Sequence, residues 1–204
     1  MQFFSYQTFI FDFDGTLVDS NSIKEKGFFE CAKKYSNGNN IMNKIKDNPI
    51  NKNRFTIFKE FSKNITESKE RAEEIYRDLL FEYRKYTVSN ILKLAPIKGS
   101  ISLLKKLKNI KKSIYINSAT PLESLSFVIN RRGLNIFFDG IYGLESSKII
   151  NLKKIQENSN CEKNLMIMIG DGLDDEEAAH NFGIKFLPVG ELLTKNKPDF
   201  TNIY

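Results

Sequence analysis

Hydrophobic residues along the chain follow two different periods, and the change between them divides it into parts. A short apolar run over 8–11 is β-branched or aromatic, which is typical of a strand buried on both faces. From Asp19 to Ala95 apolar residues recur at helical spacing, with no convincing buried strand. From Pro96 onward short apolar runs alternate with amphipathic segments. The pattern predicts an α/β core over 1–18 and 96–204, with a small inserted α-helical cap domain over 19–95.

The alternating part predicts parallel βαβ units, with helices on both faces of one Rossmann-like sheet. After the first strand, strands are expected over 113–118, 137–142, 165–169 and 184–189. Helices are expected around 101–107 and over 122–131, 148–157 and 174–181. In such a sheet the ligand site lies beyond the carboxyl ends of the strands.

The inserted region predicts several helices and no repeats. Ile23, Phe28, Cys31 and Tyr35 are spaced as one helix face. A short helix is expected over 55–61, and a long one begins near 66–70. The stretch Asn37-Gly38-Asn39-Asn40 predicts a loop between helices.

Two carboxylates, Asp12 and Asp14, interrupt the first apolar strand near its end. Residues i and i+2 of an extended chain project to the same face, so these side chains are expected side by side. Two like charges emerging from an apolar strand cost too much free energy unless a cation or a proton transfer uses them. The alternative is an ordinary turn rich in Asp and Gly, because Gly15 follows directly.

Three later positions carry complementary chemistry: Ser118, Lys148 and the acidic cluster that begins at Asp171. Ser118 ends a strand, where its hydroxyl and the following backbone N–H groups could hold an anion, although a lone Ser there is usually a cap. Lys148 stands where a helix begins and could pair with a phosphate, with Lys153 and Lys154 as competitors.

The fourth strand ends in an acidic cluster that runs from Asp171 to Glu177. Carboxylates at a strand end are suitable ligands for a hard cation such as Mg²⁺. The alternative is an acidic helix start that complements the helix dipole, which explains Asp174 better than Asp171.

Composition narrows the class of protein. The chain has 204 residues, 41% hydrophobic and 27% charged, as expected for a soluble globular protein. Its net charge of +6 comes from lysines scattered along the chain, which favours a solvated surface and an anionic substrate over a nucleic-acid partner. No signal peptide or membrane span is expected. The distant Cys31 and Cys161 suggest a reducing, cytoplasmic compartment.

In these residues the chain resembles the haloacid-dehalogenase-like phosphohydrolases. Asp12-Phe13-Asp14-Gly15-Thr16-Leu17 matches the first motif of that family, Ser118 the second, Lys148 the third, and Gly170-Asp171 through Asp175 the fourth. The third motif departs from the family pattern, because Lys148 is followed by Ile149 where a proline is often found. The helical insertion stands where subfamilies similar to phosphoglycolate phosphatase and β-phosphoglucomutase carry a cap.

The resemblance implies a role for each matched position. Asp12 would be the nucleophile that forms an aspartyl-phosphate, and Asp14 the general acid and later the general base. Mg²⁺ would be held by the Asp12 carboxylate, the Asp14 backbone carbonyl and Asp171, with Asp175 as ligand or support. The phosphoryl oxygens would be bound by Ser118, Ala119 and Lys148.

The resemblance therefore implies a Mg²⁺-dependent phosphatase for a small phosphorylated metabolite, with no nucleic-acid or membrane partner and a monomeric or homodimeric state. Candidate substrate contacts in the insertion are Lys24, Lys52 and Arg54, whereas His180 is expected in packing or on the surface. A phosphosugar mutase would use the same aspartates, and a catalytically silent binding or regulatory protein is a further alternative. The acidic strand end argues against a dehalogenase, and the expected cap disfavours a nucleic-acid end-processing phosphatase.

Overall fold

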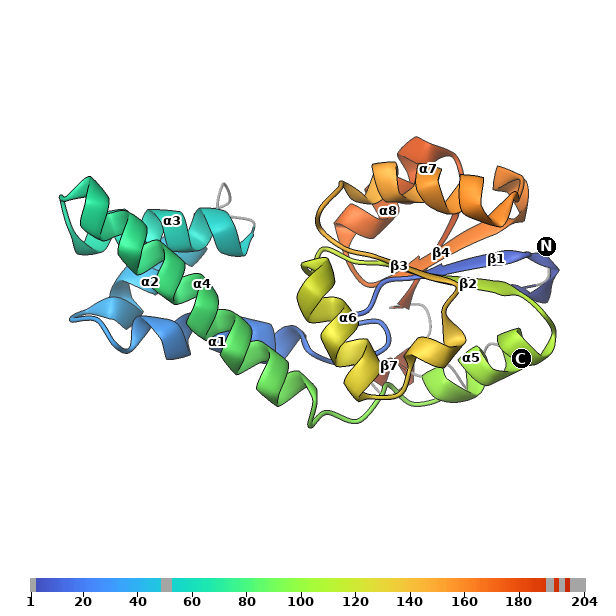
Figure 1. Cartoon of the computed structure of the whole chain (residues 1–204), viewed down its shortest axis with the longest axis horizontal. Coiled ribbons are helices and arrows are strands. Elements are labelled where there is room, and N and C mark those ends of the chain that lie inside the picture. Colours follow the sequence, from blue (N-terminus) through green and yellow to red (C-terminus); the bar gives the residue numbers. More distant parts are fainter. Residues whose placement is uncertain (1–2, 49–52, 190–192, 195–196, 199–204) are drawn as a thin grey trace. The chain divides into compact units, whose positions relative to one another are not determined.

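The computed structural model describes residues 3–48, 53–189, 193–194 and 197–198 of the chain. The chain forms two compact units, of which the first combines Met1–Ser20 with Leu94–Tyr204. The second consists of Asn21–Lys93. The first unit is called the α/β unit below and the second the helical unit. Figure 1 shows both, coloured along the sequence.

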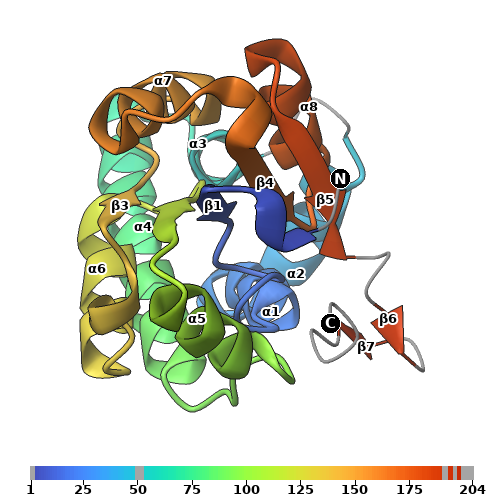
Figure 2. The ribbon, with the colours of Figure 1, turned by 90° about the vertical axis from the view of Figure 1, so that its right-hand side faces the viewer.

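The α/β unit is built on a five-stranded sheet whose order is β3-β2-β1-β4-β5 and whose strand pairs are all parallel. Figure 2 shows these strands in the ribbon. Their bounds are β1 Thr8–Phe11, β2 Ser113–Asn117, β3 Gly140–Tyr142, β4 Met166–Gly170 and β5 Lys185–Pro188. The predicted Rossmann-like α/β fold is therefore confirmed. A separate antiparallel pair joins β6 (Leu193–Thr194) to β7 (Lys197–Pro198).

Helices cover both faces of the sheet, as Figure 1 shows. On one face lie α5 (Ser100–Asn109) and α6 (Leu122–Arg131), and on the other α7 (Lys148–Ser159) and α8 (Leu173–Phe182). Short 3-10 helices lie at Phe3–Ser5, Asn135–Phe137 and Lys163–Leu165. Helix α6 has the predicted bounds because Leu125, Val128 and Ile129 recur at helical spacing and are buried.

The two central strands are apolar on both faces, and this fixes where polar chemistry can occur. Every residue of β1 and β4 is buried, and β1 pairs with β2 on one side and β4 on the other. Because parallel strands end at the same edge, the loops after β1, β2 and β4 meet there. Polar residues that follow these strands are therefore brought together.

The strand expected over 137–142 is shorter than predicted, because β3 begins only at Gly140. The residues before it form the 3-10 helix Asn135–Phe137, and Phe137 is buried from that turn. Asp139 then joins the turn to β2, since its backbone N–H donates to the Ile114 carbonyl at 2.7 Å and its carboxylate accepts from the Ile114 N–H at 2.8 Å. An apolar residue at the start of a run can thus be buried without belonging to the strand.

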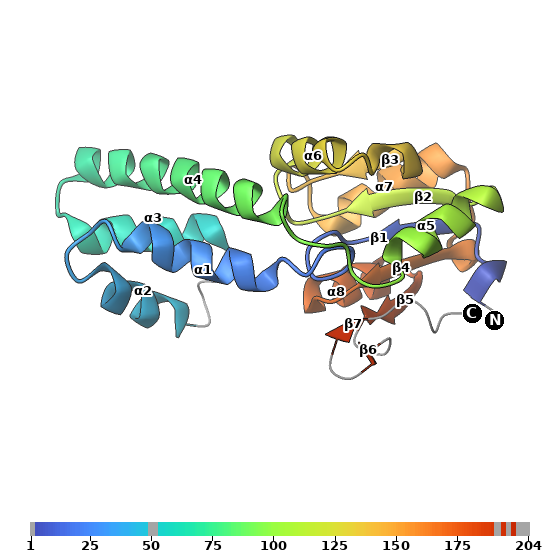
Figure 3. The ribbon, with the colours of Figure 1, turned by 90° about the horizontal axis from the view of Figure 1, so that it is seen from below.

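The helical unit contains α1 (Asn21–Ala32), α2 (Gly38–Lys46), α3 (Arg54–Ile65) and α4 (Lys69–Ile91), which Figure 3 shows from below. Helices thus form a separate compact unit over Asn21–Lys93, within the region 19–95 where the sequence predicts a helical insertion. None of the helices in the described part of the chain has the length and apolarity that crossing a bilayer requires.

The loop predicted over Asn37–Asn40 is wrong for most of that stretch, because α2 begins at Gly38. Residues 33–37 connect α1 to α2, and the last of them, Asn37, is in the left-handed region at φ 56°. The backbone of Gly38 lies so close to the Ala32 carbonyl that a side chain there would collide with it. The Asn-Gly pair thus makes a tight turn directly before a helix, and burial of Met42 and Ile45 stabilises that helix.

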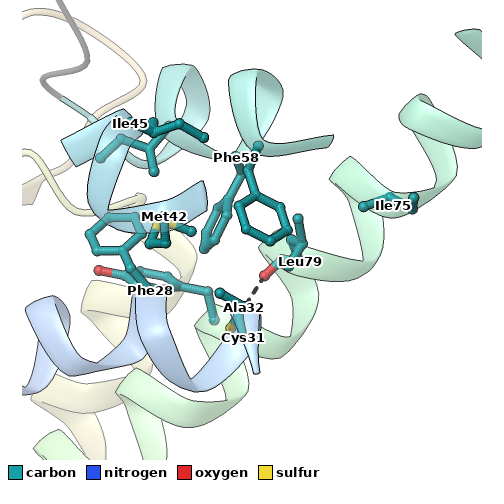
Figure 4. Close-up of a cluster of buried hydrophobic side chains, with 11 residues drawn as sticks. Phe28, Cys31, Ala32, Met42, Ile45, Phe58, Ile75 and Leu79 are labelled. Carbon is teal, nitrogen blue, oxygen red and sulfur yellow. Dashed lines mark hydrogen bonds between the residues drawn. The ribbon is translucent and has the colours of Figure 1, made fainter. Parts of the chain in front are cut away.

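Aromatic and aliphatic side chains together form the core of the helical unit, part of which Figure 4 shows. The ring of Phe58 in α3 is fully buried between Phe28 and Tyr83, with ring centroids 5.2 and 5.4 Å away. Gly27 allows this packing, because a β-carbon there would lie 2.9 Å from the Tyr83 ring. Phe58 therefore joins three of the four helices.

We expect Phe58→Ala to destabilise the helical unit by about 3–5 kcal/mol, since it removes a buried ring and leaves a cavity. Chemical denaturation monitored by circular dichroism measures the loss. Phe81→Ala is the matched control, because Phe81 on α4 is 66% exposed, and it should change stability by no more than about 0.5 kcal/mol. Equal losses in the two variants would contradict the packing role of Phe58.

Candidate active site

The loop after β1 carries two buried carboxylates. Asp12 and Asp14 are only 5% and 6% exposed. Gly15 follows at φ 76°, a conformation that favours glycine, and its N–H donates to the Val18 carbonyl at 2.7 Å. The chain therefore turns directly after Asp14, and both aspartates lie just beyond the carboxyl end of β1.

Asp12 lies close to two further carboxylates, which follow the neighbouring strand β4. One ligand oxygen each from Asp12, Asp171 and Asp175 lies within 4.8 Å of the others. Asp171 follows β4, and Asp175 is a buried residue in the first turn of α8. Gly170 makes the approach possible, because a side chain at that position would collide with the Asp175 carboxylate. We call Asp12, Asp171 and Asp175 the carboxylate cluster.

The ammonium of Lys148 lies against this cluster. Its Nζ atom forms an ion pair with Asp175, lies 2.9 Å from Asp174 Oδ2 and lies 3.6 Å from Asp12 Oδ1. Burial opposes the charged ammonium, but the carboxylates of Asp12, Asp175 and Asp174 more than offset this effect and raise the pKa of Lys148 above its ordinary value. Lys148 is therefore charged at neutral pH.

The competing lysines lie elsewhere. Lys153 is exposed, and the Lys154 ammonium donates to Ser146 Oγ at 3.0 Å. Of the three lysines considered from the sequence, the structure thus brings Lys148 to the carboxylates.

Asp175 is held by both its backbone surroundings and Lys148. The Gly172 N–H donates to Asp175 Oδ2 at 3.1 Å. Burial of the carboxyl, at 1% exposure, raises the pKa of Asp175 above its ordinary value, while the Lys148 ammonium opposes that rise. The carboxylate needs positive charge beside it to stay ionised at this depth.

Asp14 has a different environment from Asp12. Both of its carboxylate oxygens accept hydrogen bonds from buried hydroxyls, Ser20 Oγ to Oδ1 at 2.5 Å and Thr120 Oγ1 to Oδ2 at 2.7 Å. These bonds fix the orientation of the carboxylate without adding a formal charge. The two aspartates of one loop are therefore held by different chemistry.

Ser118 and Ala119 lie at the end of β2, beside a pocket of about 310 Å³. Ser118 is buried and its Oγ accepts from the Thr120 N–H at 3.2 Å, whereas Ala119 is exposed. The remaining lining residues come from the loop before α7, from α7 itself and from α8: Leu144, Ser146, Ser147, Lys148, Ile149, Asp174, Glu177, Ala178 and Asn181.

The carboxylate cluster fits a hard divalent cation. Its donors are carboxylate oxygens, the ligands that Mg²⁺ prefers. Three carboxylates carry more negative charge than the Lys148 ammonium balances. Mg²⁺ at Asp12, Asp171 and Asp175 would reduce that repulsion.

The other residues expected to bind substrate or to lie on the surface fall in different places. Arg54 lies in the helical unit, with its guanidinium 5.3 Å from the centre of the Tyr83 ring. Lys24 is half-buried in the same unit, and Lys52 lies outside the described residues. His180 is exposed on α8, as expected for a surface residue.

Sequence reasoning missed three hydroxyl side chains and one carboxylate. Ser20 and Thr120 bind Asp14, Thr16 Oγ1 donates to Asp171 Oδ1 at 3.2 Å, and Asp174 pairs with Lys148. Thr120 carried a signal, since it lies two residues after Ser118 in a loop at the same sheet edge. Nothing in the local sequence of Ser20 indicates the contact with Asp14.

Comparison with known proteins identifies the family. The sequence profile described as haloacid dehalogenase-like hydrolase matches residues 9–189, which include both halves of the α/β unit and every residue of the site described above. The chain belongs to this family. The prediction of a haloacid-dehalogenase-like hydrolase is confirmed. A search of curated proteins found no match.

Solved structures of this family share the fold at low sequence identity. A predicted phosphoglycolate phosphatase from Haemophilus somnus is 14% identical with a TM-score of 0.69, over 97% of this chain and 88% of that one. CbbY from Rhodobacter sphaeroides, in complex with xylulose-(1,5)bisphosphate, is 14% identical with a TM-score of 0.67, over 89% and 84%. YfnB from Bacillus subtilis, bound to magnesium, is 17% identical with a TM-score of 0.65, over 95% and 92%.

We expect Asp171→Asn to weaken Mg²⁺ binding at least about tenfold, because an amide brings no charge to the carboxylate cluster. Isothermal titration calorimetry with MgCl₂ measures the affinity. Asp47→Asn is the matched control, since Asp47 is exposed at the end of α2, and its affinity should equal that of the wild type. Unchanged Mg²⁺ affinity in Asp171→Asn would remove Asp171 from the metal site.

Proposed function

We propose that the protein is a Mg²⁺-dependent phosphatase that hydrolyses a small phosphorylated metabolite through an aspartyl-phosphate. One observation carries this proposal. A buried aspartate, Asp12, meets two further carboxylates and a charged lysine at the carboxyl edge of a parallel sheet. Such a group can attack phosphorus only if positive charge beside it offsets the repulsion between a carboxylate and a phosphate dianion.

Asp12 is the nucleophile in this proposal. One of its carboxylate oxygens forms a bond to phosphorus while the bond from phosphorus to the leaving oxygen breaks, which gives an aspartyl-phosphate and an alcohol. Water then attacks phosphorus, releases inorganic phosphate and restores the Asp12 carboxylate. Its position directly after β1, at 5% exposure, gives the carboxylate a fixed direction.

Asp14 moves the proton in both steps. It donates a proton to the leaving oxygen and later takes one from the attacking water. The hydroxyls of Ser20 and Thr120 hold its carboxylate. Their two hydrogen bonds orient the Asp14 carboxylate for the proton transfer.

The phosphoryl oxygens bind Lys148, the Ser118 hydroxyl and the backbone N–H of Ala119. The pocket that these three residues line supports this assignment. Asp12, Asp171, Asp175 and the Asp14 backbone carbonyl hold Mg²⁺. When bound, the metal supplies positive charge that stabilises the negative charge of the transition state.

The helical unit is proposed to act as a cap that selects the substrate. The pocket beside Lys148 has a volume of about 310 Å³, which is within the range of sites that bind small molecules. Lys24, Lys52 and Arg54 are the candidate cap contacts. The remaining expectations, a cytoplasmic monomer or homodimer without nucleic-acid or membrane partners, stay part of this proposal.

We expect the purified protein to hydrolyse at least one member of a panel of small phosphate esters, with Mg²⁺ required. Released phosphate measures turnover, and addition of EDTA should abolish it. Asp12→Asn should lower kcat at least about 10⁴-fold, because it removes the nucleophile. Full activity in Asp12→Asn would refute the nucleophile assignment, and no turnover of any ester by the wild type would refute the phosphatase.

Asp14→Asn should slow hydrolysis of the phosphoenzyme by about 10²–10⁴-fold, because the attacking water loses its general base. The phosphoenzyme should form slowly and then persist. The variant is mixed with an ester that the wild type hydrolyses and is quenched with acid at increasing times. Intact-protein mass spectrometry then measures the lifetime of the phosphoenzyme. Rapid loss of the phosphoryl group in Asp14→Asn would assign the proton transfer to another residue.

A further inference from the structure

Two buried asparagines link the end of β2 to the start of α7. Asn117 is the last residue of β2 and is fully buried, and Asn151 in the first turn of α7 is 2% exposed. The Asn151 amide Nδ2 donates to Asn117 Oδ1 at 3.0 Å and to the Gly143 carbonyl at 2.9 Å. The Asn117 Nδ2 in turn donates to the backbone carbonyl of Lys148 at 3.0 Å.

Two buried amide side chains are unusual at a contact between a sheet and a helix. An amide taken from water without hydrogen-bond partners costs on the order of 2–7 kcal/mol, and apolar side chains are the usual choice at the surface between a sheet and a helix. Here the amides bind each other and three main-chain carbonyls, those of Gly143, Ser146 and Lys148. A satisfied buried network selects one arrangement of the segments it joins, since any shift leaves polar atoms unpaired.

The segment that this network holds is the main chain at Lys148. The lysine side chain has four rotatable bonds, so the position of its ammonium depends on a fixed main chain. Lys148 is followed by Ile149, and no proline ring fixes the backbone dihedral angle at this point. The hydrogen bond from Asn117 to the Lys148 carbonyl provides a direct constraint.

The same region also joins Lys148 to the loop of Ser118. The Ser118 N–H donates to the Tyr142 carbonyl at 3.0 Å, and the Leu144 N–H donates to the Thr120 carbonyl at 3.1 Å. Gly143, whose carbonyl binds Asn151, allows this approach, since a β-carbon there would lie 2.6 Å from the Leu122 nitrogen. The loops after β2 and β3 are thus fixed together, with the amide pair beneath them.

We propose that Asn117 and Asn151 are positioning residues that set the Lys148 ammonium for phosphate binding. The inference rests on the proposed phosphatase function, because it assumes that Lys148 binds a phosphoryl group. Neither asparagine touches the substrate. Both act through the main chain at the start of α7.

The test is a double-mutant cycle on inorganic phosphate binding, measured by ³¹P NMR titration of the full-length protein with Mg²⁺ present. Asn151→Ala should weaken phosphate binding about five- to tenfold, the effect of one to two lost hydrogen bonds. In a Lys148→Met background the same change should have less than about a twofold effect, because the group it positions is gone. Asn130→Ala, at an exposed asparagine near the end of α6, should bind phosphate as the wild type does.

Each outcome decides between the proposals. If the wild type and Asn151→Ala bind phosphate equally, or if the loss is as large in Lys148→Met, the positioning role is overturned while the phosphatase proposal stands. If the wild type binds no phosphate, the proposed function is contradicted and the positioning role falls with it. If Asn151→Ala does not fold, Asn117→Ser takes its place in the cycle, because a serine hydroxyl is too short to reach the Lys148 carbonyl.

Discussion

The repulsion among three closely spaced carboxylates is the constraint on which the rest of the site depends. Asp12, Asp171 and Asp175 come within 4.8 Å of one another at the edge of an apolar sheet, and burial makes the charges of Asp12 and Asp175 costly, whereas Asp171 is exposed. The Lys148 ammonium, at the start of α7, neutralises part of that negative charge. The sheet supplies the free energy that allows this arrangement, since β1 and β4 are buried along their whole length. A parallel sheet can hold such a cluster because its stability comes from the strands and its chemistry from the loops that follow them.

The sequence predicted the sheet well because buried parallel strands leave a strong signal. The strand at Thr8–Phe11 and the helix at Leu122–Arg131 have the predicted bounds, and both have a clear apolar period. The two misses have a common cause. Asn37–Asn40 and the start of the strand expected at 137–142 were judged from local residue types, whereas tertiary contacts decide them. Gly38 begins a helix against the Ala32 carbonyl, and Phe137 is buried from a 3-10 turn.

The same limit applies to the site. Motif spacing could point to Asp12, Asp14, Lys148 and Asp171, because each follows a strand or begins a helix. The partners of Asp14 could not be found in this way. Ser20 Oγ and Thr120 Oγ1 reach its two oxygens from positions 6 and 106 residues away along the chain. The amide pair Asn117–Asn151 is harder still, because its polar residues occupy positions where an apolar residue is expected and become intelligible only once their hydrogen bonds are known.

These contacts separate two carboxylates that the sequence places two residues apart. An extended strand would present Asp12 and Asp14 as equivalent neighbours, but β1 ends at Phe11 and the chain turns at Gly15. Asp12 therefore lies among charged groups, and Asp14 accepts hydrogen bonds from two neutral hydroxyls. The Lys148 ammonium beside Asp12 reduces the repulsion between that carboxylate and a phosphate dianion, whereas the two hydroxyls hold the Asp14 carboxylate in one orientation. The difference in surroundings, and not the order of the residues, is what supports distinct roles for the two aspartates.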